Sequence, residues 1–234
     1  MTTPAPSKNQ PAMIRVLIVD DHPVLRQGLM QVIDDEPDLV VCGEAKGAED
    51  ALAELESCKP DVAVVDLSLN GRSGLELVRD IKASRPSTAV LVYSMYDETL
   101  YAERAIRAGA SGYVMKQEPV DEVLAAIRQI LQGHVYLSAA ASTRMVQRAV
   151  DGNGACARSA LEELSDREME ILHLLGQGLS SRQIGEKLFR SIKTIESHRE
   201  NMKSKLGLKT SGELLRYAVE RSLELERCPG GNPP

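Results

Sequence analysis

The stretch Asp61-Val62-Ala63-Val64-Val65-Asp66 is a short apolar run that ends in a carboxylate. It is rich in valine, follows Lys59-Pro60, and has the length of a strand buried on both faces of a parallel sheet, although periodicity alone also allows a buried helix. The asparagine and glycines of residues 67–74 predict a turn directly after it. Asp66 is therefore expected at the carboxyl end of a strand, where open α/β sheets bind ligands.

Similar runs of strand length alternate with helical patterns on both sides of this stretch. The expected strands are residues 14–19, 39–42, 61–66, 89–93 and 113–115, and helical spacing of apolar residues follows each of them. Strict alternation of strand and helix predicts a flavodoxin-like parallel sheet with helices on both faces. Right-handed crossovers would bring all the strand ends to one edge of that sheet.

Charged and hydroxyl residues stand at those strand ends. Acidic residues often begin loops, and this simpler interpretation accounts for any single position, but it does not explain why such residues from four different strands should meet. The residues concerned are Asp20, Asp21, Asp66, Ser94 and Lys116.

This set of residues suggests phosphoryl chemistry. Three carboxylates in close proximity repel one another and need a cation, and ligation by oxygen alone favours Mg²⁺. One carboxylate could then attack a phosphoryl donor and form an acyl phosphate. Lys116 would balance the transferred charge, and Ser94 would donate a hydrogen bond to a phosphoryl oxygen. The expected product is a phospho-aspartate.

Residues 14–132 resemble the receiver domain of a two-component response regulator. The motifs that carry the resemblance are Asp20-Asp21-His22-Pro23, Val64-Val65-Asp66-Leu67, Ser94, Gly109-Ala110-Ser111-Gly112-Tyr113 and Lys116. Many receivers have proline directly after the lysine, whereas Gln117-Glu118-Pro119 follows here, so the resemblance does not carry over the cis peptide bond usual at that place.

The resemblance assigns a role to each of these positions. Asp66 is implied to be the phosphoacceptor. Asp21 would ligate Mg²⁺ directly, Asp20 would act through water, and the backbone carbonyl of Ser68 would complete the protein ligands. The switch hydroxyl and switch aromatic fall on Ser94 and Tyr113.

Three of these side chains also have ordinary structural interpretations. Tyr113 alone would be a half-buried strand aromatic, and Ser94 alone would be a strand-end cap. His22 stands beside the acids, where it could be a metal ligand or phosphoacceptor. A histidine that opens a helix is more often involved in packing and capping, which is the interpretation we adopt for it.

Composition and charge constrain the type of protein. No apolar stretch approaches the ~20 residues of a membrane span, residues 1–10 do not resemble a signal peptide, and the four cysteines show no metal-ligand spacing. We therefore expect a cytoplasmic protein with reduced, unpaired thiols and no membrane association. Residues 1–164 carry a net charge of −8 and residues 165–234 carry +2, with +5 in residues 182–209. This asymmetry suggests two tasks, one of them on nucleic acid.

The second half of the chain has a compact helical pattern. Ser165 and Glu168 have the spacing of a capping box, as do Thr210 and Glu213. Between these helices, a short helix capped by Ser180 or Ser181, a turn at residues 189–191 and a longer basic helix predict a helix-turn-helix. A solvated basic face is the commoner origin of such lysines, but here they cluster on the helix after the turn.

Residues 164–219 closely resemble the LuxR-type helix-turn-helix, and the two resemblances together indicate the NarL/FixJ family of response regulators. The matching motifs are Leu164-Ser165-x-Arg167-Glu168, Gly178-Leu179-Ser180, Gln183-Ile184, Leu188, Ser191-Ile192-Lys193-Thr194-Ile195, His198-Arg199 and Lys205-Leu206-Gly207.

By that resemblance residues 192–205 form the recognition helix. Glu196 and Glu200 occupy positions where the family often has basic or small residues, and they could accept from cytosine or merely pair with Arg199 or Lys203. Gly185 replaces the usual alanine, which suggests tight packing. The candidates for DNA contact are Lys193, Thr194, Ser197, His198, Arg199, Lys203 and Lys205.

The sequence thus predicts a disordered tail (1–12), a receiver domain (13–132), a linker (133–160), a LuxR-type DNA-binding domain (161–227) and a second disordered tail (228–234). The expected protein is a transcriptional regulator, not an enzyme. By the resemblance, a sensor histidine kinase would phosphorylate it on Asp66 with Mg²⁺, and it would then bind promoter DNA as a homodimer, with a dimer face on residues 211–225. Release of a recognition helix masked by the receiver is also implied.

Two alternatives remain. A Mg²⁺-dependent aspartyl phosphatase or transferase would need a second acid two residues after the nucleophile, where Ser68 stands. A phosphorelay intermediate would not need a complete helix-turn-helix.

Overall fold

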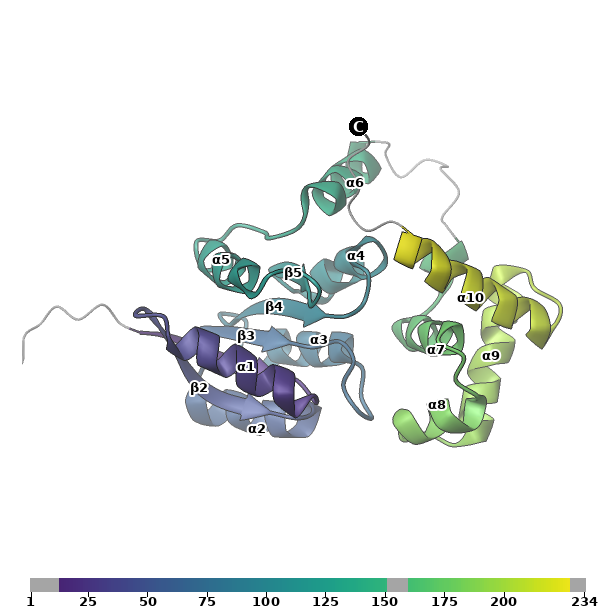
Figure 1. Cartoon of the computed structure of the whole chain (residues 1–234), viewed down its shortest axis with the longest axis horizontal. Helices are drawn as coiled ribbons and strands as arrows, with labels where there is room; N and C mark the ends of the chain where they lie inside the picture. Colours follow the sequence, from purple (N-terminus) through teal and green to yellow (C-terminus); the bar gives the residue numbers. More distant parts are fainter. Residues whose placement is uncertain (1–12, 151–159, 228–234) are drawn as a thin grey trace, which may run out of the picture.

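The computed structural model describes residues 13–150 and 160–227. Within these ranges the chain forms an α/β unit followed by a smaller group of helices, which lies at the sheet edge toward which the strands point (Figure 1). The two predicted tails, Cys156 and Cys228 lie outside the described residues, as do residues 151–159 of the expected linker.

Five parallel strands form one sheet in the order β2-β1-β3-β4-β5. The strands are β1 (Ile14–Val19), β2 (Leu39–Ala45), β3 (Val62–Val65), β4 (Ala89–Ser94) and β5 (Gly112–Met115). A helix follows each of them: α1 (Pro23–Asp34), α2 (Ala48–Cys58), α3 (Gly74–Ser84), α4 (Glu98–Ala108) and α5 (Val120–Leu131). Helices α1 and α5 pack on one face of the sheet, and α2, α3 and α4 pack on the other. The predicted flavodoxin-like fold is confirmed.

The central strand β3 is buried on both faces, as its unbroken apolar sequence predicts. Val62 and Val64 face α1 and α5, whereas Ala63 and Val65 face the helices on the opposite side. Strand β2 is longer than predicted, because it continues past Cys42 to Ala45. As an edge strand it tolerates Gly43 and Glu44, which interrupt the apolar pattern on which the prediction depended.

The first half of the expected linker packs on the α/β unit. Gly133 turns the chain with φ 84°, and Tyr136 then forms a parallel bridge with Gly112 at the outer edge of β5. Helix α6 (Ala139–Val150) follows and contacts α4, with Ala141 buried. The segment around Tyr136 is joined to the sheet by this short bridge alone. Its sequence therefore has little strand pattern from which the pairing could be predicted.

The second unit contains a 3₁₀ turn, η1 (Ala160–Glu163), and the helices α7 (Asp166–Gly176), α8 (Ser181–Lys187), α9 (Ile192–Leu206) and α10 (Ser211–Arg227). Both predicted capping boxes are present: Ser165 caps α7 with Glu168, and Thr210 caps α10 with Glu213. Ser180, not Ser181, caps α8. Helices α8 and α9 form the predicted helix-turn-helix.

A close approach inside the turn explains the glycine at position 185. A Cβ atom on Gly185 would lie 2.7 Å from the carbonyl oxygen of Arg190, so α8 can approach the turn only without a side chain there. Next to it, Phe189 has the left-handed φ of 50° and leaves its ring largely exposed.

The two cysteines within the described residues do not form a disulfide. Cys42 and Cys58 are free thiols, and the S–H group of Cys42 donates to Sγ of Cys58 at 3.1 Å. Burial, and then the neighbouring thiol, raise the pKa of Cys42 to about 12.

Among the described residues, no helix is both long enough and apolar enough to span a bilayer.

Candidate functional site

Lys116 joins two carboxylates that are far apart in the sequence. Its Nζ lies 2.6 Å from Oδ2 of Asp20 and 2.7 Å from Oδ2 of Asp66, and all three side chains are buried. Burial alone would lower the pKa of Lys116, but the carboxylates of Asp66 and Asp20 outweigh it and raise that pKa. The ammonium group therefore stays charged, and this edge of the sheet holds a buried ionic cluster.

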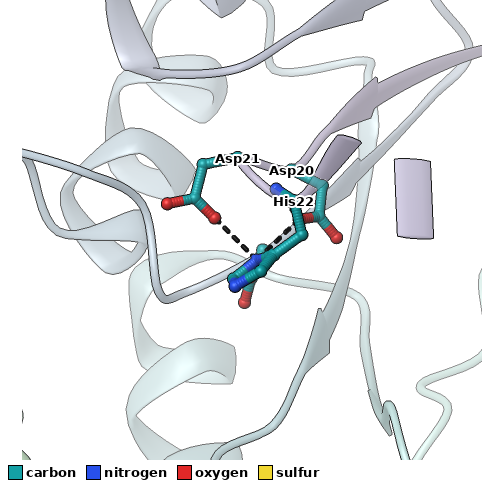
Figure 2. A group of neighbouring side chains, drawn as sticks. Asp20, Asp21 and His22 are labelled. Carbon is teal, nitrogen blue, oxygen red and sulfur yellow. Dashed lines mark hydrogen bonds and ion pairs between the residues drawn. The ribbon is translucent and has the colours of Figure 1, made fainter. Parts of the chain in front are cut away.

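Asp21 completes the acidic group. Ligand atoms of Asp20, Asp21, His22 and Asp66 all lie within 4.8 Å of one another, and Figure 2 shows the first three converging. Oδ2 of Asp21 accepts a hydrogen bond from Asn70 at 2.6 Å. Burial raises the pKa of Asp21, and the charges of Asp66 and Asp20 raise it further, whereas the nearby His22 opposes them.

One buried oxygen of Asp21 lacks a hydrogen bond. Its Oδ1 has no donor with suitable geometry, although Nδ1 of His22 lies 2.8 Å away. A buried acceptor without a donor, beside two further carboxylates, offers oxygen ligands of the kind that divalent cations prefer. The acidic group is thus compatible with a divalent metal ion, as the sequence predicted.

The structure corrects the packing and capping interpretation of His22. His22 occupies the N-cap position of α1, but its side chain makes no capping hydrogen bond and is 55% exposed. Its ring lies instead beside the acids, with Nδ1 3.2 Å from Oδ1 of Asp20 (Figure 2). The backbone N–H of His22 also donates to Oδ1 of Asp20, at 2.8 Å, so both the backbone and the ring of His22 lie beside the acids.

The loop after β3 holds Asp66 in place. The backbone N–H of Ser68 donates to Oδ1 of Asp66 at 3.0 Å. At the end of this loop, a Cβ atom on Gly74 would lie 2.4 Å from the carbonyl oxygen of Asp66 and 2.5 Å from Cα of Leu67. Helix α3 can begin this close to the candidate phosphoacceptor only because Gly74 has no side chain.

The predicted switch residues meet through Tyr96. Ser94 is fully buried at the end of β4, and its Oγ accepts a long hydrogen bond of 3.4 Å from the backbone N–H of Tyr96. The hydroxyl of Tyr113 donates to the carbonyl of Tyr96 at 2.7 Å. Tyr113 is 1% exposed, so it is not the half-buried strand aromatic of the simpler interpretation. Sequence analysis did not single out Tyr96.

The ring of Tyr96 also contacts the second unit. It meets His173 of α7 edge-on with ring centroids 4.6 Å apart, and it stacks on Tyr101 at 4.7 Å. Burial, with a smaller effect of the Lys187 charge, lowers the pKa of His173 to about 4. The imidazole is therefore neutral near pH 7.

Ion pairs hold the two units together beside this contact. Asp166, at the start of α7, accepts from Arg79 at 2.6 Å and from Arg104 at 3.0 Å. Arg104 also donates to the carbonyl of Leu161 at 2.7 Å. On the other side of the interface the Phe189 ring lies against Gly71. The sequence contains no signal that pairs residues of two separate units, so all these contacts were missed.

The candidate DNA contacts on α9 fall into two groups. Lys193 and Ser197 are exposed on the outward face, which the receiver does not cover in this arrangement. The side chains of Arg199 and Lys203 are only 16% and 14% exposed. Arg199 donates to Oγ of Ser181 at 2.5 Å, so it lies against α8.

The other three candidates also have contacts within the protein. Thr194 shares a hydrogen bond with the Ser191 cap at 2.8 Å. His198 is half-buried, and burial lowers its pKa. Lys205 lies 2.7 Å from Glu168 of the α7 capping box. Of the seven candidates, Lys193, Ser197 and Lys205 are exposed, although Ser197 donates to the carbonyl of Lys193 at 2.9 Å and Lys205 pairs with Glu168.

Two families of known proteins match the two units. Residues 16–128 match the response regulator receiver domain, and residues 162–218 match the bacterial regulatory proteins of the luxR family. With the fold and the conjunction of Asp66, Lys116 and the helix-turn-helix, these matches identify the class: the chain is a DNA-binding response regulator of the NarL/FixJ family.

Particular relatives agree with this class. The oxygen regulatory protein NreC of Staphylococcus carnosus is 35% identical over 214 residues, which cover 90% of this chain and 99% of the relative. NreC of Staphylococcus aureus strain JH9 is 36% identical over the same lengths. Among solved structures, the RcsB response regulator of Salmonella typhimurium matches with a TM-score of 0.66 and 25% identity, covering 89% of this chain and 98% of that one.

Another structure, of an RcsB–DNA complex, matches with a TM-score of 0.62 and 25% identity, covering 88% of this chain and 98% of that one.

Proposed function

We propose that this transcription regulator is controlled by transfer of a phosphoryl group to Asp66. A phosphohistidine of a sensor histidine kinase would be the donor: the Asp66 carboxylate attacks phosphorus, the P–N bond breaks, and the imidazole leaves with a proton. The observation that carries the proposal is the position of Lys116 Nζ, 2.7 Å from Oδ2 of Asp66. A fixed cation there can stabilise the added negative charge.

Asp20, Asp21 and Asp66, with the carbonyl of Ser68, would hold Mg²⁺ at this site. The bound ion would supply the positive charge that lets phosphoryl oxygens approach three carboxylates. The unpaired Oδ1 of Asp21 supports this assignment. Asn70 would keep Asp21 oriented through its hydrogen bond to the other carboxylate oxygen.

The new charge would act on the second unit through β4. A phosphoryl group adds about −1.5 to −2 charges, which Ser94 can meet with its hydroxyl. In doing so Ser94 would give up its long contact with Tyr96, whose ring packs on His173 of α7. Tyr113 would follow because its hydroxyl bonds to Tyr96. Phosphorylation would thus weaken the interface between the two units.

Opening of this interface would favour a dimer on promoter DNA. The interface does not cover the outward face of α9, so the masked recognition helix implied by the family resemblance is not our explanation for control. Ala218 and Ser222 of α10 instead line a cleft shared with α4. Separation would release α10, with its exposed Leu215, as the dimer face. The two recognition helices of the dimer would then bind paired half-sites. This regulation would take place in the cytoplasm.

Binding to DNA from the region upstream of the chain's own gene tests this proposal. The full-length protein is measured by fluorescence anisotropy with and without acetyl phosphate and Mg²⁺. We expect tighter binding and a larger assembly after treatment, and an affinity that falls steeply with added salt. Lys193→Ala should weaken binding to all sequences. Equal binding with and without treatment would contradict control by phosphorylation.

A further inference from the structure

The outward face of α9 has an unusual composition for a helix that enters DNA. Ile195 and Met202 face the core, and the opposite side exposes Lys193, Ser197 and Glu200 at spacings of four and three residues. Glu196 lies at the margin of this face with its side chain 47% exposed, and the side chain of Glu200 is 65% exposed. Two carboxylates are therefore accessible on or beside the exposed face of the predicted recognition helix.

The basic side chains nearest to these acids are more buried than the acids themselves. Arg199 pairs with Glu196 at 3.2 Å, and Lys203 pairs with Glu200 at 2.9 Å, both at a helical spacing of three residues. Each cation is much less exposed than its acid. The cations thus offset the repulsion between the carboxylates and DNA phosphates, and the carboxylates extend furthest into solvent.

Pairing leaves each carboxylate able to accept again. Both ion pairs use Oε1 of the glutamate, so Oε2 of each carboxylate remains able to accept a hydrogen bond. The pair with Arg199 also restricts the carboxylate of Glu196, because Arg199 is itself fixed by its bond to Ser181 of α8. An oriented acceptor without a donor can select among bases by hydrogen bonding.

The chemistry of the major groove limits which base such an acceptor can bind. Guanine presents only the acceptors N7 and O6, which repel a carboxylate. Adenine places its N6 donor beside the N7 acceptor, and cytosine offers the N4 donor alone. Resting on the DNA binding proposed above, we infer that Glu196 and Glu200 determine sequence specificity by accepting hydrogen bonds from cytosine N4.

Replacement by glutamine separates base recognition from a simple effect of charge. Glutamine has the same length, but its amide both donates and accepts, which matches adenine N6 and N7. If the acids only reduce the charge of the face, Glu196→Gln and Glu200→Gln will tighten binding to every duplex alike. If they contact cytosine, the same variants will change which base is preferred.

The experiment is selection from a pool of randomised duplexes by the full-length protein treated with acetyl phosphate and Mg²⁺, followed by anisotropy on selected sites. The variants are Glu196→Gln, Glu200→Gln and the pair. Glu76→Gln is the matched control, because it removes an exposed helical acid paired with Arg72 on the receiver.

We expect cytosine at one or two positions of each selected half-site. Changing one of these cytosines should weaken wild-type binding about tenfold. The corresponding glutamine variant should prefer adenine at that position only, and Glu76→Gln should select the wild-type site.

An unchanged base preference in both glutamine variants, with uniformly tighter binding, would overturn the inference and leave the proposed DNA binding intact. Failure of the wild-type protein to select any duplex would instead contradict the proposed function.

Discussion

The interface between the two units can be weakened at Arg104 without altering either core. Arg104→Met keeps most of the aliphatic stem but removes the contacts with Asp166 and with the carbonyl of Leu161. Because Arg104 and Asp166 are each 17% exposed, solvent screens their interaction only partly. The lost charged hydrogen bonds would be worth about 3 kcal/mol, and the remaining pair between Arg79 and Asp166 would recover part of this. We estimate a net loss of about 2 kcal/mol, or about 30-fold in the opening equilibrium.

Alkylation of a reporter thiol measures that opening equilibrium. Met169 is 3% exposed and lines the cleft between α4 and α7, so Met169→Cys should react with iodoacetamide only when the units separate. We expect reaction at position 169 to be about 30-fold faster in the Arg104→Met background, measured by peptide mass mapping. Arg107→Met is the control, because Arg107 is 78% exposed and pairs with Glu103 of its own helix.

Equal reaction rates in the Arg104→Met and Arg107→Met backgrounds, with both proteins folded by circular dichroism, would refute the assignment of Arg104 to the interface.

Two further predictions concern particular positions. Gly74→Ala should destabilise the protein by about 3 kcal/mol in urea unfolding, because the new Cβ meets the backbone after Asp66, whereas Gly28→Ala, with open space around it, should stabilise α1 by about 0.5–1 kcal/mol. Equal effects of these two substitutions would contradict the close approach of α3. Neutral His173, which packs against Tyr96, should stabilise the closed arrangement fully above pH ~6.5. Because its pKa is lowered in the closed form, protonation favours the open form. This stabilisation should therefore decrease by about 1.4 kcal/mol per pH unit as the pH falls toward 4. Reporter alkylation should reveal this loss between pH 7 and 5.5, after correction for the pH dependence of a model thiol, and His173→Gln should abolish it; a pH dependence that survives in His173→Gln would assign it to another group.

The sequence predicted most of the fold because each element carries a local signal. The doubly buried β3 is an unbroken apolar run, and α7 and α10 begin at the capping boxes that the sequence predicted. The convergence of Asp20, Asp66 and Lys116 followed from topology, since parallel strands end at one edge. These features could be predicted because they depend on the local sequence pattern and on the order of strands and helices along the chain.

What the sequence did not predict depends on contacts between separate parts of the chain. The edge of His173 meets Tyr96 across two units, and neither residue has a motif that indicates the other. His22 was misinterpreted because its local position favours a cap, whereas the acids brought beside it by folding determine where its ring lies. Similarly, the resemblance to the LuxR-type helix-turn-helix placed Arg199 among the candidates for DNA contact, but only packing shows that it lies against Ser181.

The central claim is that Asp66 accepts a phosphoryl group at a site completed by Lys116 and a divalent cation. Full-length protein is incubated with acetyl phosphate and Mg²⁺, and the modified residue is located by tandem mass spectrometry. The account predicts one base-labile phosphoryl group on the peptide that contains Asp66, lost in Asp66→Asn and on chelation of the metal. Undiminished labelling of Asp66→Asn, or a phosphoryl group on His22, would contradict it.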